Sequence, residues 1–300
     1  MKGKTNKSIR LSQNFLNNSN LVHQLVSKSS IGHEDIVFEI GAGNGIITEE
    51  LAKQSKKVIA VEIDHELFNK LQTKFDSNSA VEIRLGNFLD YPLPTTPYKI
   101  YSNIPFNITA DVIHKIVNAP NPPDDSYLIV QKEAAYKFAG QPQAKESRAS
   151  ILIKPFFEVD IAYQFRKTDF SLIPSVDIVL MRISKKVNPS VNSTNRTLYE
   201  DLISYVFSQW QPTVFDCLKS IFTKQQFSRL SNNLEFSITS TPTQLTFEQW
   251  LGIFNYFVVG VEANKKRLVL GGASKQSEIE QKLVKVHRTR NDPNWRQKKL

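Results

Sequence analysis

The first 183 residues alternate short apolar runs with amphipathic stretches, and this alternation limits the choice of fold more than any other feature. The predicted strands are DIVFEI (35–40), KVIAVEI (57–63), AVEIRL (80–85), YKIYS (98–102), SYLIVQ (126–131) and, later, VDIVLMRI (176–183). Between them, IITEELAKQ, ELFNKLQTKF, ITADVIHKIV and KEAAYKF space their apolar residues as helices do. Continuous apolar strands alternating with helices are typical of a parallel sheet covered on both faces. We therefore predict a doubly wound, Rossmann-like α/β fold with a mainly parallel sheet, in which the last strand is a candidate for antiparallel addition.

The composition turns polar at KKVNPSVNSTNRT (185–197), which we interpret as a linker. Helical spacing then returns in LYEDLISYVFSQW, CLKSIFTKQQFSRL and FEQWLGIFNYFVV, and predicts a small all-helical domain. We expect three parts: an α/β domain over 1–183 that starts with a basic tail at 1–10, a linker with a helical RNA-binding domain over 184–264, and a basic tail over 265–300.

The net charge of +9 is concentrated at the two ends of the chain. Residues 1–10 carry four basic and no acidic side chains, and residues 265–300 carry eleven basic and three acidic ones. Clustered lysines and arginines attract polyanions, so nucleic acid is the leading candidate partner, although solvated ends alone would also account for them.

Several classes of protein are excluded by composition. No apolar run approaches the ~18 residues of a membrane span, and the basic N-terminus lacks the apolar stretch of a secretory signal. The single cysteine, Cys217, excludes an internal disulfide and a thiolate metal site. We expect a cytoplasmic protein with no membrane contact and no metal.

Three glycines, Gly41, Gly43 and Gly45, stand between the first predicted strand and its helix. Glycines there let the backbone turn tightly and approach a ligand at the positive end of the helix. Glu62 ends the next strand, where doubly wound domains carry a carboxylate for ribose hydroxyls. Each feature alone could be structural. Together they predict an adenosine-type cofactor, which leaves NAD and S-adenosyl-L-methionine open.

Two details favour S-adenosylmethionine. The glycine spacing is G-x-G-x-G rather than G-x-G-x-x-G, and Glu39 stands two residues before the first glycine. A carboxylate there would repel a pyrophosphate but can bind the ammonium group of a methionine moiety; capping of a helix end is the alternative. No G-K-[ST] follows, which excludes a P-loop.

The segment Asn103-Ile104-Pro105-Phe106 follows the fourth predicted strand, at the sheet edge where such folds bind ligands. The exocyclic amine of adenine is a poor nucleophile because its lone pair is delocalised into the ring. The Asn103 side-chain oxygen and the Ile104 carbonyl can accept its two N–H groups and aim the lone pair. Pro105 fixes the backbone, and Phe106 offers a face on which a base can stack. An ordinary loop with a buried phenylalanine is the alternative.

A series of short motifs runs in order from about residue 10 to residue 260. They are LSQNFL (11–16), EIGAGNG (39–45), VEID (61–64), GNFLDYPLP (86–94), NIPF (103–106), QKEAA (131–135), FSLIPSVD (170–177), IFTKQQF (221–227) and LTFEQWLGIFNYF (245–257). In this order they resemble the Erm-type adenine-N6 methyltransferases of 23S ribosomal RNA, relatives of the KsgA-type small-subunit dimethyltransferases. The helical segments look like Erm rather than KsgA.

The resemblance implies roles for individual residues. Those implied to contact S-adenosylmethionine are Asn14, Leu16, Gly41, Glu62, Ile63, Asn87 and Asn103. Those implied to address the target base are Asn103, Ile104, Phe106 and Phe170, of which Asn103 and Phe106 would act in catalysis. Two positions depart from the family: Asn87 replaces the usual aspartate that accepts from the cofactor's adenine amine, and Leu172 replaces a frequent proline. An amide oxygen still accepts a hydrogen bond, but less strongly than a carboxylate.

The function implied by the resemblance is transfer of one or two methyl groups to N6 of one adenine in 23S rRNA, with resistance to macrolides, lincosamides and streptogramin B. We expect the protein to act as a monomer. A small-subunit (16S) rRNA dimethyltransferase and a non-enzymatic RNA-binding assembly factor on the same fold are the alternatives. The glycine turn alone would also allow a nicotinamide-dependent oxidoreductase, which has no use for NIPF.

Overall fold

The structure is a computed structural model that describes residues 15–282. Asn14, the basic segment 1–10 and residues 283–300 lie outside the described residues.

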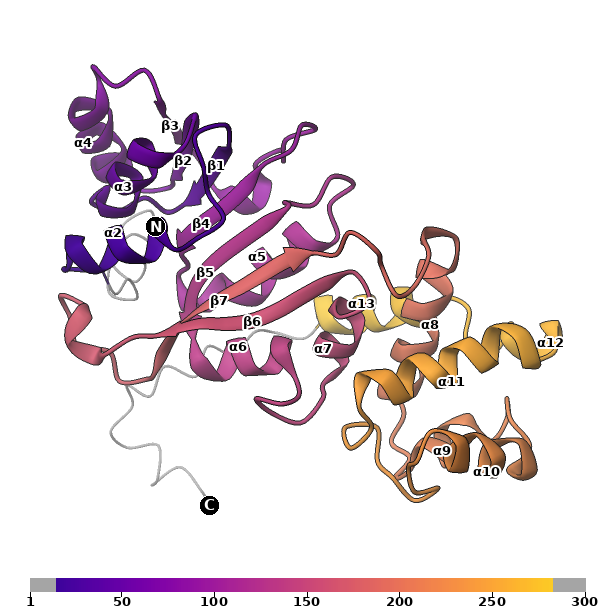
Figure 1. Ribbon diagram of the computed structural model, residues 1–300. Helices are drawn as coiled ribbons and strands as arrows, with labels where there is room; N and C mark the ends of the chain where they lie inside the picture. Colours follow the sequence, from indigo (N-terminus) through magenta and orange to yellow (C-terminus); the bar gives the residue numbers. More distant parts are fainter. Residues whose placement is uncertain (1–14, 283–300) are drawn as a thin grey trace.

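One seven-stranded sheet in the order β3-β2-β1-β4-β5-β7-β6 forms the centre of the protein (Figure 1). The strands are β1 (Ile36–Ile40), β2 (Lys57–Glu62), β3 (Val81–Leu85), β4 (Lys99–Asn103), β5 (Asp125–Gln131), β6 (Phe157–Gln164) and β7 (Ile178–Lys185). The first five pair in parallel, and β7 lies antiparallel to both β5 and β6. The predicted doubly wound, mainly parallel fold is confirmed, with the last predicted strand antiparallel.

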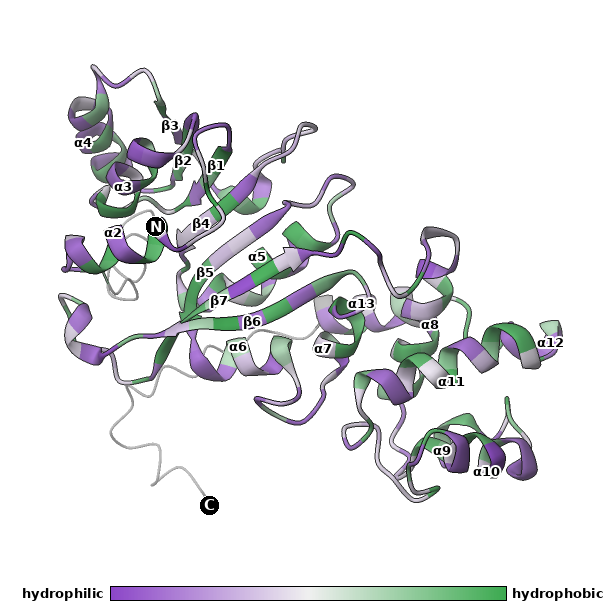
Figure 2. Ribbon diagram, in the orientation of Figure 1, coloured by the Kyte–Doolittle hydropathy of each residue, from purple (hydrophilic) through white to green (hydrophobic). Residues whose placement is uncertain are grey.

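Successive residues of each inner strand point to opposite faces, so each face has its own core. Val37 and Val58 pack against one helical layer, whereas Phe38 and Ile59 pack against the other. The first layer consists of α2 (Ser19–Ser27), α3 (Ile46–Gln54) and α4 (His65–Phe75). The second consists of α5 (Thr109–Val117), α6 (Lys132–Ala139) and α7 (Arg148–Ile153). Figure 2 shows hydrophobic and hydrophilic residues alternating along the strands and helices.

The C-terminal part of the described chain is helical. Its helices are α8 (Arg196–Phe207), α9 (Val214–Leu218), α10 (Lys224–Asn233), α11 (Phe247–Gly260), α12 (Ala263–Lys266) and α13 (Gly272–Lys282). The buried side chains of Trp250, Phe254 and Phe257 belong to the same hydrophobic cluster as Phe38. The core of the helical region is therefore continuous with the α5–α7 layer of the sheet.

Helix α13, within the segment expected to be a basic tail, runs back along α8 (Figure 1). The buried carboxylate of Asp201 in α8 accepts hydrogen bonds from Gly271 N and Ala273 N, both at 3.0 Å. Asp201 thus satisfies orphan donors at the start of α13 and holds it in place. The Arg148–Glu280 ion pair joins α13 to α7 as well.

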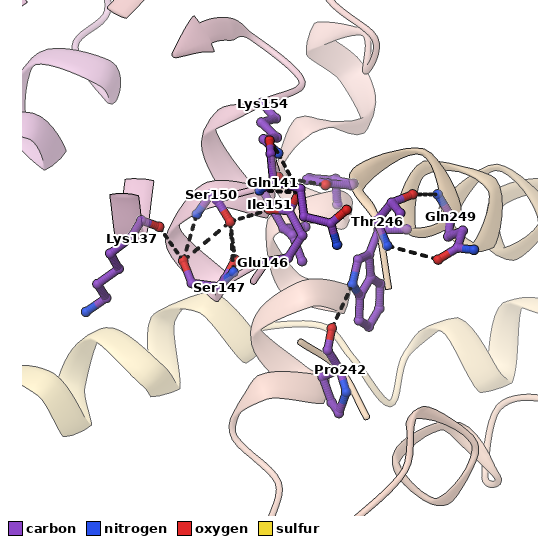
Figure 3. Close-up of polar contacts among 12 residues, drawn as sticks. Lys137, Gln141, Glu146, Ser147, Ser150, Ile151, Lys154, Pro242, Thr246 and Gln249 are labelled. Carbon is purple, nitrogen blue, oxygen red and sulfur yellow. Dashed lines mark hydrogen bonds and ion pairs between the residues drawn. The ribbon is translucent and has the colours of Figure 1, made fainter. Parts of the chain in front are cut away.

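Figure 3 shows the polar contacts that build the α6–α7 connection and the start of α11. Glu146 is 2 % exposed, accepts a 2.5 Å hydrogen bond from Ser150 Oγ and forms an ion pair with Lys154. In the helical region, Trp250 Nε1 donates to the Pro242 carbonyl at 3.2 Å. Each buried polar group in these contacts has a partner, as a stable interior requires.

Strand β6 and helix α7 were not predicted from the sequence. In β6 only Phe157 is fully buried and the other residues alternate between partly buried and exposed, because the strand lies at the sheet edge. The run CLKSIFTKQQFSRL also divides in two, since Thr223 and Gln226 form a capping box that starts α10. Within residues 15–282, no helix combines the length and apolarity needed to cross a membrane.

Candidate active site

A pocket opens at the carboxyl edge of the sheet between β1 and β4, where the strand order reverses. Open α/β sheets bind ligands at such a switch point. The Ser102 hydroxyl joins the two strands there, because it donates to Ile40 O at 2.5 Å and accepts from Ile40 N at 3.2 Å. The lining residues are Phe15, Leu16, Glu39, Gly41, Ala42, Gly43, Asn44, Ile46, Ile47, Asn103, Ile104, Pro105 and Phe106.

The glycine turn after β1 forms one wall of the pocket. Gly41 and Gly43 have φ of +72° and +58°, a conformation that side chains with a Cβ rarely adopt. A Cβ on Gly41 would meet no atom within 4 Å, so this glycine leaves open space beside the pocket. A Cβ on Gly43 would lie 2.7 Å from the Phe15 ring, so this glycine allows Phe15 to pack directly on the turn.

Phe15, Leu16 and Asn17, here called the N-terminal strap, are held by a segment far along the chain. Ser171 N donates to Phe15 O at 2.8 Å, and Asn17 N donates to Asp169 O at 3.1 Å. Leu16 and Phe170 pair between these two bonds as an antiparallel bridge. The strap therefore crosses the glycine turn at a position set by residues 169–171.

Glu39 is 1 % exposed and lines the pocket, and its Oε2 accepts a 2.5 Å hydrogen bond from Thr48 Oγ1. Burial raises the pKa of Glu39 to about 8; the Thr48 hydrogen bond opposes this shift and the nearby Glu62 charge adds to it. A buried carboxyl with a raised pKa is more readily ionised beside a cation. The site is thus suited to a positively charged ligand group.

Glu62 ends β2 and is fully buried. Its Oε2 accepts from Gly43 N at 2.9 Å, and its Oε1 accepts from Ile63 N and Asp64 N, each at 2.9 Å. The carboxylate therefore fixes the glycine turn and the chain that follows β2. This is a structural contribution that the sequence interpretation, which assigned Glu62 to ribose hydroxyls, did not include.

The opposite wall is built by NIPF. Asn103 ends β4, and Ile104 N donates to Ile129 O of the neighbouring strand at 3.1 Å. Phe106 begins a short 3₁₀ helix, η2 (Phe106–Ile108), that leads directly into α5. Its ring is half-buried and packs against the cluster that contains Leu16, so part of the face expected to stack on a base is covered by the protein.

Of the predicted site residues that lie within 15–282, four do not line this pocket. Phe170 is 2 % exposed and packs against Phe165 with ring centroids 5.5 Å apart, so it anchors the strap where a base-holding aromatic was expected. Ile63 is 46 % exposed at the same sheet edge, and Asn87 lies beyond the neighbouring β3. The fourth is Glu62. The structure thus brings together Leu16, Gly41, Asn103, Ile104 and Phe106, and leaves the others around them.

Phe15 was missed by sequence reasoning, although it lies between Asn14 and Leu16 in the QNFL motif. The Phe15 ring packs against Gly43, where a Cβ would not fit. This contact joins two separate parts of the chain, so the sequence alone contained no sign of it. Within the described residues, no group of three or more His, Cys, Asp or Glu side chains could hold a metal ion.

Comparison with known proteins identifies the family. Residues 4–258 match the family described as ribosomal RNA adenine dimethylase. The chain belongs to this family. Its enzyme class, an rRNA adenine N6-methyltransferase, therefore agrees with the class predicted from the sequence.

Individual members of the rRNA adenine dimethylase family align with most of the chain. A small-subunit rRNA methyltransferase A from Mycoplasmopsis pulmonis is 32% identical over 218 residues, 72% of this chain and 85% of the relative. An rRNA adenine N-6-methyltransferase from Escherichia coli is 30% identical over 255 residues, 85% of this chain and 98% of the relative. The crystal structure of the 23S rRNA methyltransferase ErmE has a TM-score of 0.76 at 23% identity, covering 82% of this chain and 100% of that one. At that identity the likeness shows the fold.

Proposed function

We propose that this protein transfers one or two methyl groups from S-adenosylmethionine to N6 of one adenine in 23S rRNA. The observation that carries the proposal is the pocket with two chemically different walls. One wall combines the glycine turn with a buried carboxyl, and the other presents Asn103, Ile104 and Phe106. The first suits an adenosine ligand with an ammonium group, and the second suits a planar base with an exocyclic amine.

The residues of the first wall fit S-adenosylmethionine. Glu39 would accept the ammonium group, and Gly41, whose missing Cβ leaves space, would lie against the methionine part. Asn14, Leu16, Glu62, Ile63 and Asn87 are proposed as the further contacts. Glu62 would reach the ribose while keeping its backbone partners, since each carboxylate oxygen accepts more than one hydrogen bond. When bound, the cofactor supplies a methyl group already activated by its sulfonium.

The residues of the second wall orient the nucleophile. The Asn103 side-chain oxygen and the Ile104 carbonyl would accept the two N6 hydrogens and direct the nitrogen lone pair across the pocket. Phe106 would stack on the base, a contact worth ~1–3 kcal/mol. The adenine must first leave its stack, at a cost of a few kcal/mol that is smallest in an unpaired loop. Transfer of the methyl group would leave S-adenosylhomocysteine, and the N6 nitrogen, now positively charged, would release one proton to water. Because that proton is acidic, a strong base is not required, and the protein's contribution is positioning.

One observation supports 23S rRNA as the substrate: the helical segments IFTKQQF and LTFEQWLGIFNYF resemble those of the Erm-type 23S rRNA methyltransferases. Methylation of this adenine in 23S rRNA would make the cell resistant to macrolides, lincosamides and streptogramin B. We further propose that the enzyme is a cytoplasmic monomer and that residues 184–264, together with the basic ends, form its RNA-binding part.

The second candidate is 16S rRNA, because the M. pulmonis relative is named a small-subunit enzyme. The test is nucleoside mass spectrometry of gel-purified 23S and 16S rRNA from cells with and without the protein. Primer extension would then locate the modified adenine, and Asn103→Ala serves as the inactive control. New N6-methyladenosine species in 23S rRNA alone support the proposal. Methylation confined to 16S rRNA favours the second candidate, and no change in either contradicts both.

A further inference from the structure

Lys115 makes an unusual set of contacts away from the pocket. It lies in α5, and its ammonium donates to three backbone carbonyls of one turn: Phe88 O at 2.8 Å, Leu89 O at 2.7 Å and Tyr91 O at 2.6 Å. A lysine ammonium has three donors, and here each has an acceptor. It also lies 5.2 Å from the centroid of the Phe88 ring.

The turn that receives these bonds joins β3 to the chain that leads to β4. It begins beside β2, since Gly86 N donates to Glu62 O at 2.9 Å, and it contains the short 3₁₀ helix η1 (Phe88–Asp90). Asn87 caps the start of η1 by accepting from Leu89 N at 3.1 Å. Lys115 holds the carbonyls at the other end. We call residues 86–91 the Asn87 turn.

A single-turn 3₁₀ helix is weakly stable on its own and depends on its end contacts. Phe88 is 3 % exposed and fixes one point of the Asn87 turn in the core. The ammonium of Lys115 fixes its backbone at three further points, with a positive charge at the carbonyl end, which is the favourable sign for a helix terminus. Burial lowers the pKa of Lys115, while the Asp90 charge opposes this shift.

Helix α5 is also the helix into which NIPF leads, through η2. Its far end holds the Asn87 turn, so one rigid element connects the base-side wall with the turn proposed to contact the cofactor's adenine. We infer that Lys115 is a positioning residue for cofactor binding, which acts by holding the Asn87 turn at the distance from β2 that the adenine requires. This inference rests on the proposed function.

The test compares Lys115→Met and Lys115→Arg with wild type and with Lys70→Met, a matched control on exposed surface of α4. Methionine keeps the apolar stem but has no donor. Arginine keeps the charge, but its planar fork matches fewer of the three carbonyls. Calorimetry gives the affinity for S-adenosylmethionine, and steady-state kinetics on an rRNA fragment give kcat and the KM of each substrate. Melting temperatures show that each variant is folded at the assay temperature.

We expect Lys115→Met to raise the Kd and KM for S-adenosylmethionine roughly tenfold, as loss of charge-assisted hydrogen bonds does. The kcat at saturating cofactor and the KM for RNA should stay near wild type. The cofactor affinity of Lys115→Arg should lie between those of wild type and Lys115→Met. In the double variant Lys115→Met/Asn87→Ala, the fold-loss of affinity for S-adenosylmethionine should be smaller than the product of the two single losses, because both residues act through one turn.

A folded Lys115→Met with unchanged cofactor affinity would overturn the inference, as would a lowered melting temperature with no change in affinity. If Lys115→Met does not fold, Lys115→Arg takes its place in the test, and an unchanged affinity of folded Lys115→Arg for S-adenosylmethionine would overturn the inference. If the wild-type protein itself fails to bind S-adenosylmethionine, it is the proposed function that fails.

Discussion

Thr48 in α3 donates a 2.5 Å hydrogen bond to the buried carboxyl of Glu39 at the end of β1. Burial raises the pKa of Glu39 to about 8, and the Thr48 bond, which favours the charged form, opposes that shift. Near neutral pH the ligand-free carboxyl is therefore mostly protonated. A cationic ligand would pair with the ionised form, so its binding must release a proton.

Affinity for S-adenosylmethionine should therefore increase with pH up to about 8 and fall again above it, because the ligand's own α-ammonium then loses its proton. One unit of pKa corresponds to ~1.4 kcal/mol, so the increase approaches tenfold per pH unit below that value. Calorimetry at pH 6, 7 and 8 in buffers of different ionisation enthalpy measures both the affinity and the released proton. Glu39→Gln should bind more weakly and lose the rise in affinity between pH 6 and 8, while Thr48→Val should raise the pKa of Glu39 and weaken binding at pH 7. A wild-type profile identical to that of Glu39→Gln would contradict the role of Glu39.

Glu62→Ala should weaken both cofactor binding and the fold. The substitution removes the acceptor for three backbone N–H groups as well as the proposed ribose contact. A hydrogen bond to a charged group contributes ~1.5–3 kcal/mol, so a ten- to hundredfold loss of affinity is expected. Thermal melting and calorimetry together separate the two effects. Glu62→Gln keeps one acceptor oxygen, so its losses of melting temperature and of cofactor affinity should both be smaller. Normal cofactor binding by a folded Glu62→Ala would show that Glu62 does not contact the cofactor.

Asn87→Asp would restore the family's usual carboxylate, but the structure shows a conflict. Asn87 Nδ2 donates to Asp90 Oδ2 at 2.8 Å, so an aspartate at 87 would face a second carboxylate. We expect Asn87→Asp alone to gain little affinity. The double variant with Asp90→Asn reverses the polarity of that contact and should bind S-adenosylmethionine at least as tightly as the parent. Calorimetric titration of wild type, Asn87→Asp and the double variant measures the three affinities. Weaker binding by the double variant than by Asn87→Asp would contradict this prediction.

Asn103→Ala should lower methyl transfer strongly with little change in melting temperature or cofactor affinity, because Asn103 is expected to border the cofactor through its backbone and the base through its side chain. Phe106→Ala should also lower transfer, and because the ring is half-buried it should cost about 1–2 kcal/mol of stability, less than the ~3–5 for a fully buried phenylalanine. Phe106→Tyr and Phe106→Trp keep a stacking face and should retain substantial activity. Methyl incorporation into an rRNA hairpin is the measurement, and near-normal incorporation by Asn103→Ala would refute the base-positioning mechanism.

Local patterns were sufficient to predict the parallel strands and the two pocket walls. The strands β1, β2 and β5 are mostly apolar and buried along nearly their whole length, and the glycine turn and NIPF each follow a strand directly. Strand β6 was missed although FEVDIAYQ alternates between apolar and polar residues, which is the pattern of a half-buried strand. The assignments of Phe170 and Glu62 were incomplete for a different reason. Phe170 pairs with Leu16, 154 residues earlier, and one of the three backbone donors to Glu62 is Gly43, 19 residues earlier; no local pattern encodes these two contacts.

The strap has a consequence for any shortened form of the enzyme. Every lining residue of the pocket lies between Phe15 and Phe106, which suggests that a fragment ending before residue 165 could bind the cofactor. Such a fragment would lack the Asp169 carbonyl and the Ser171 amide that hold the strap across the glycine turn. During synthesis, likewise, the first described residues cannot take their final place until residue 171 has left the ribosome. The residues that line the pocket are therefore synthesised well before the residues that hold the strap in place across it.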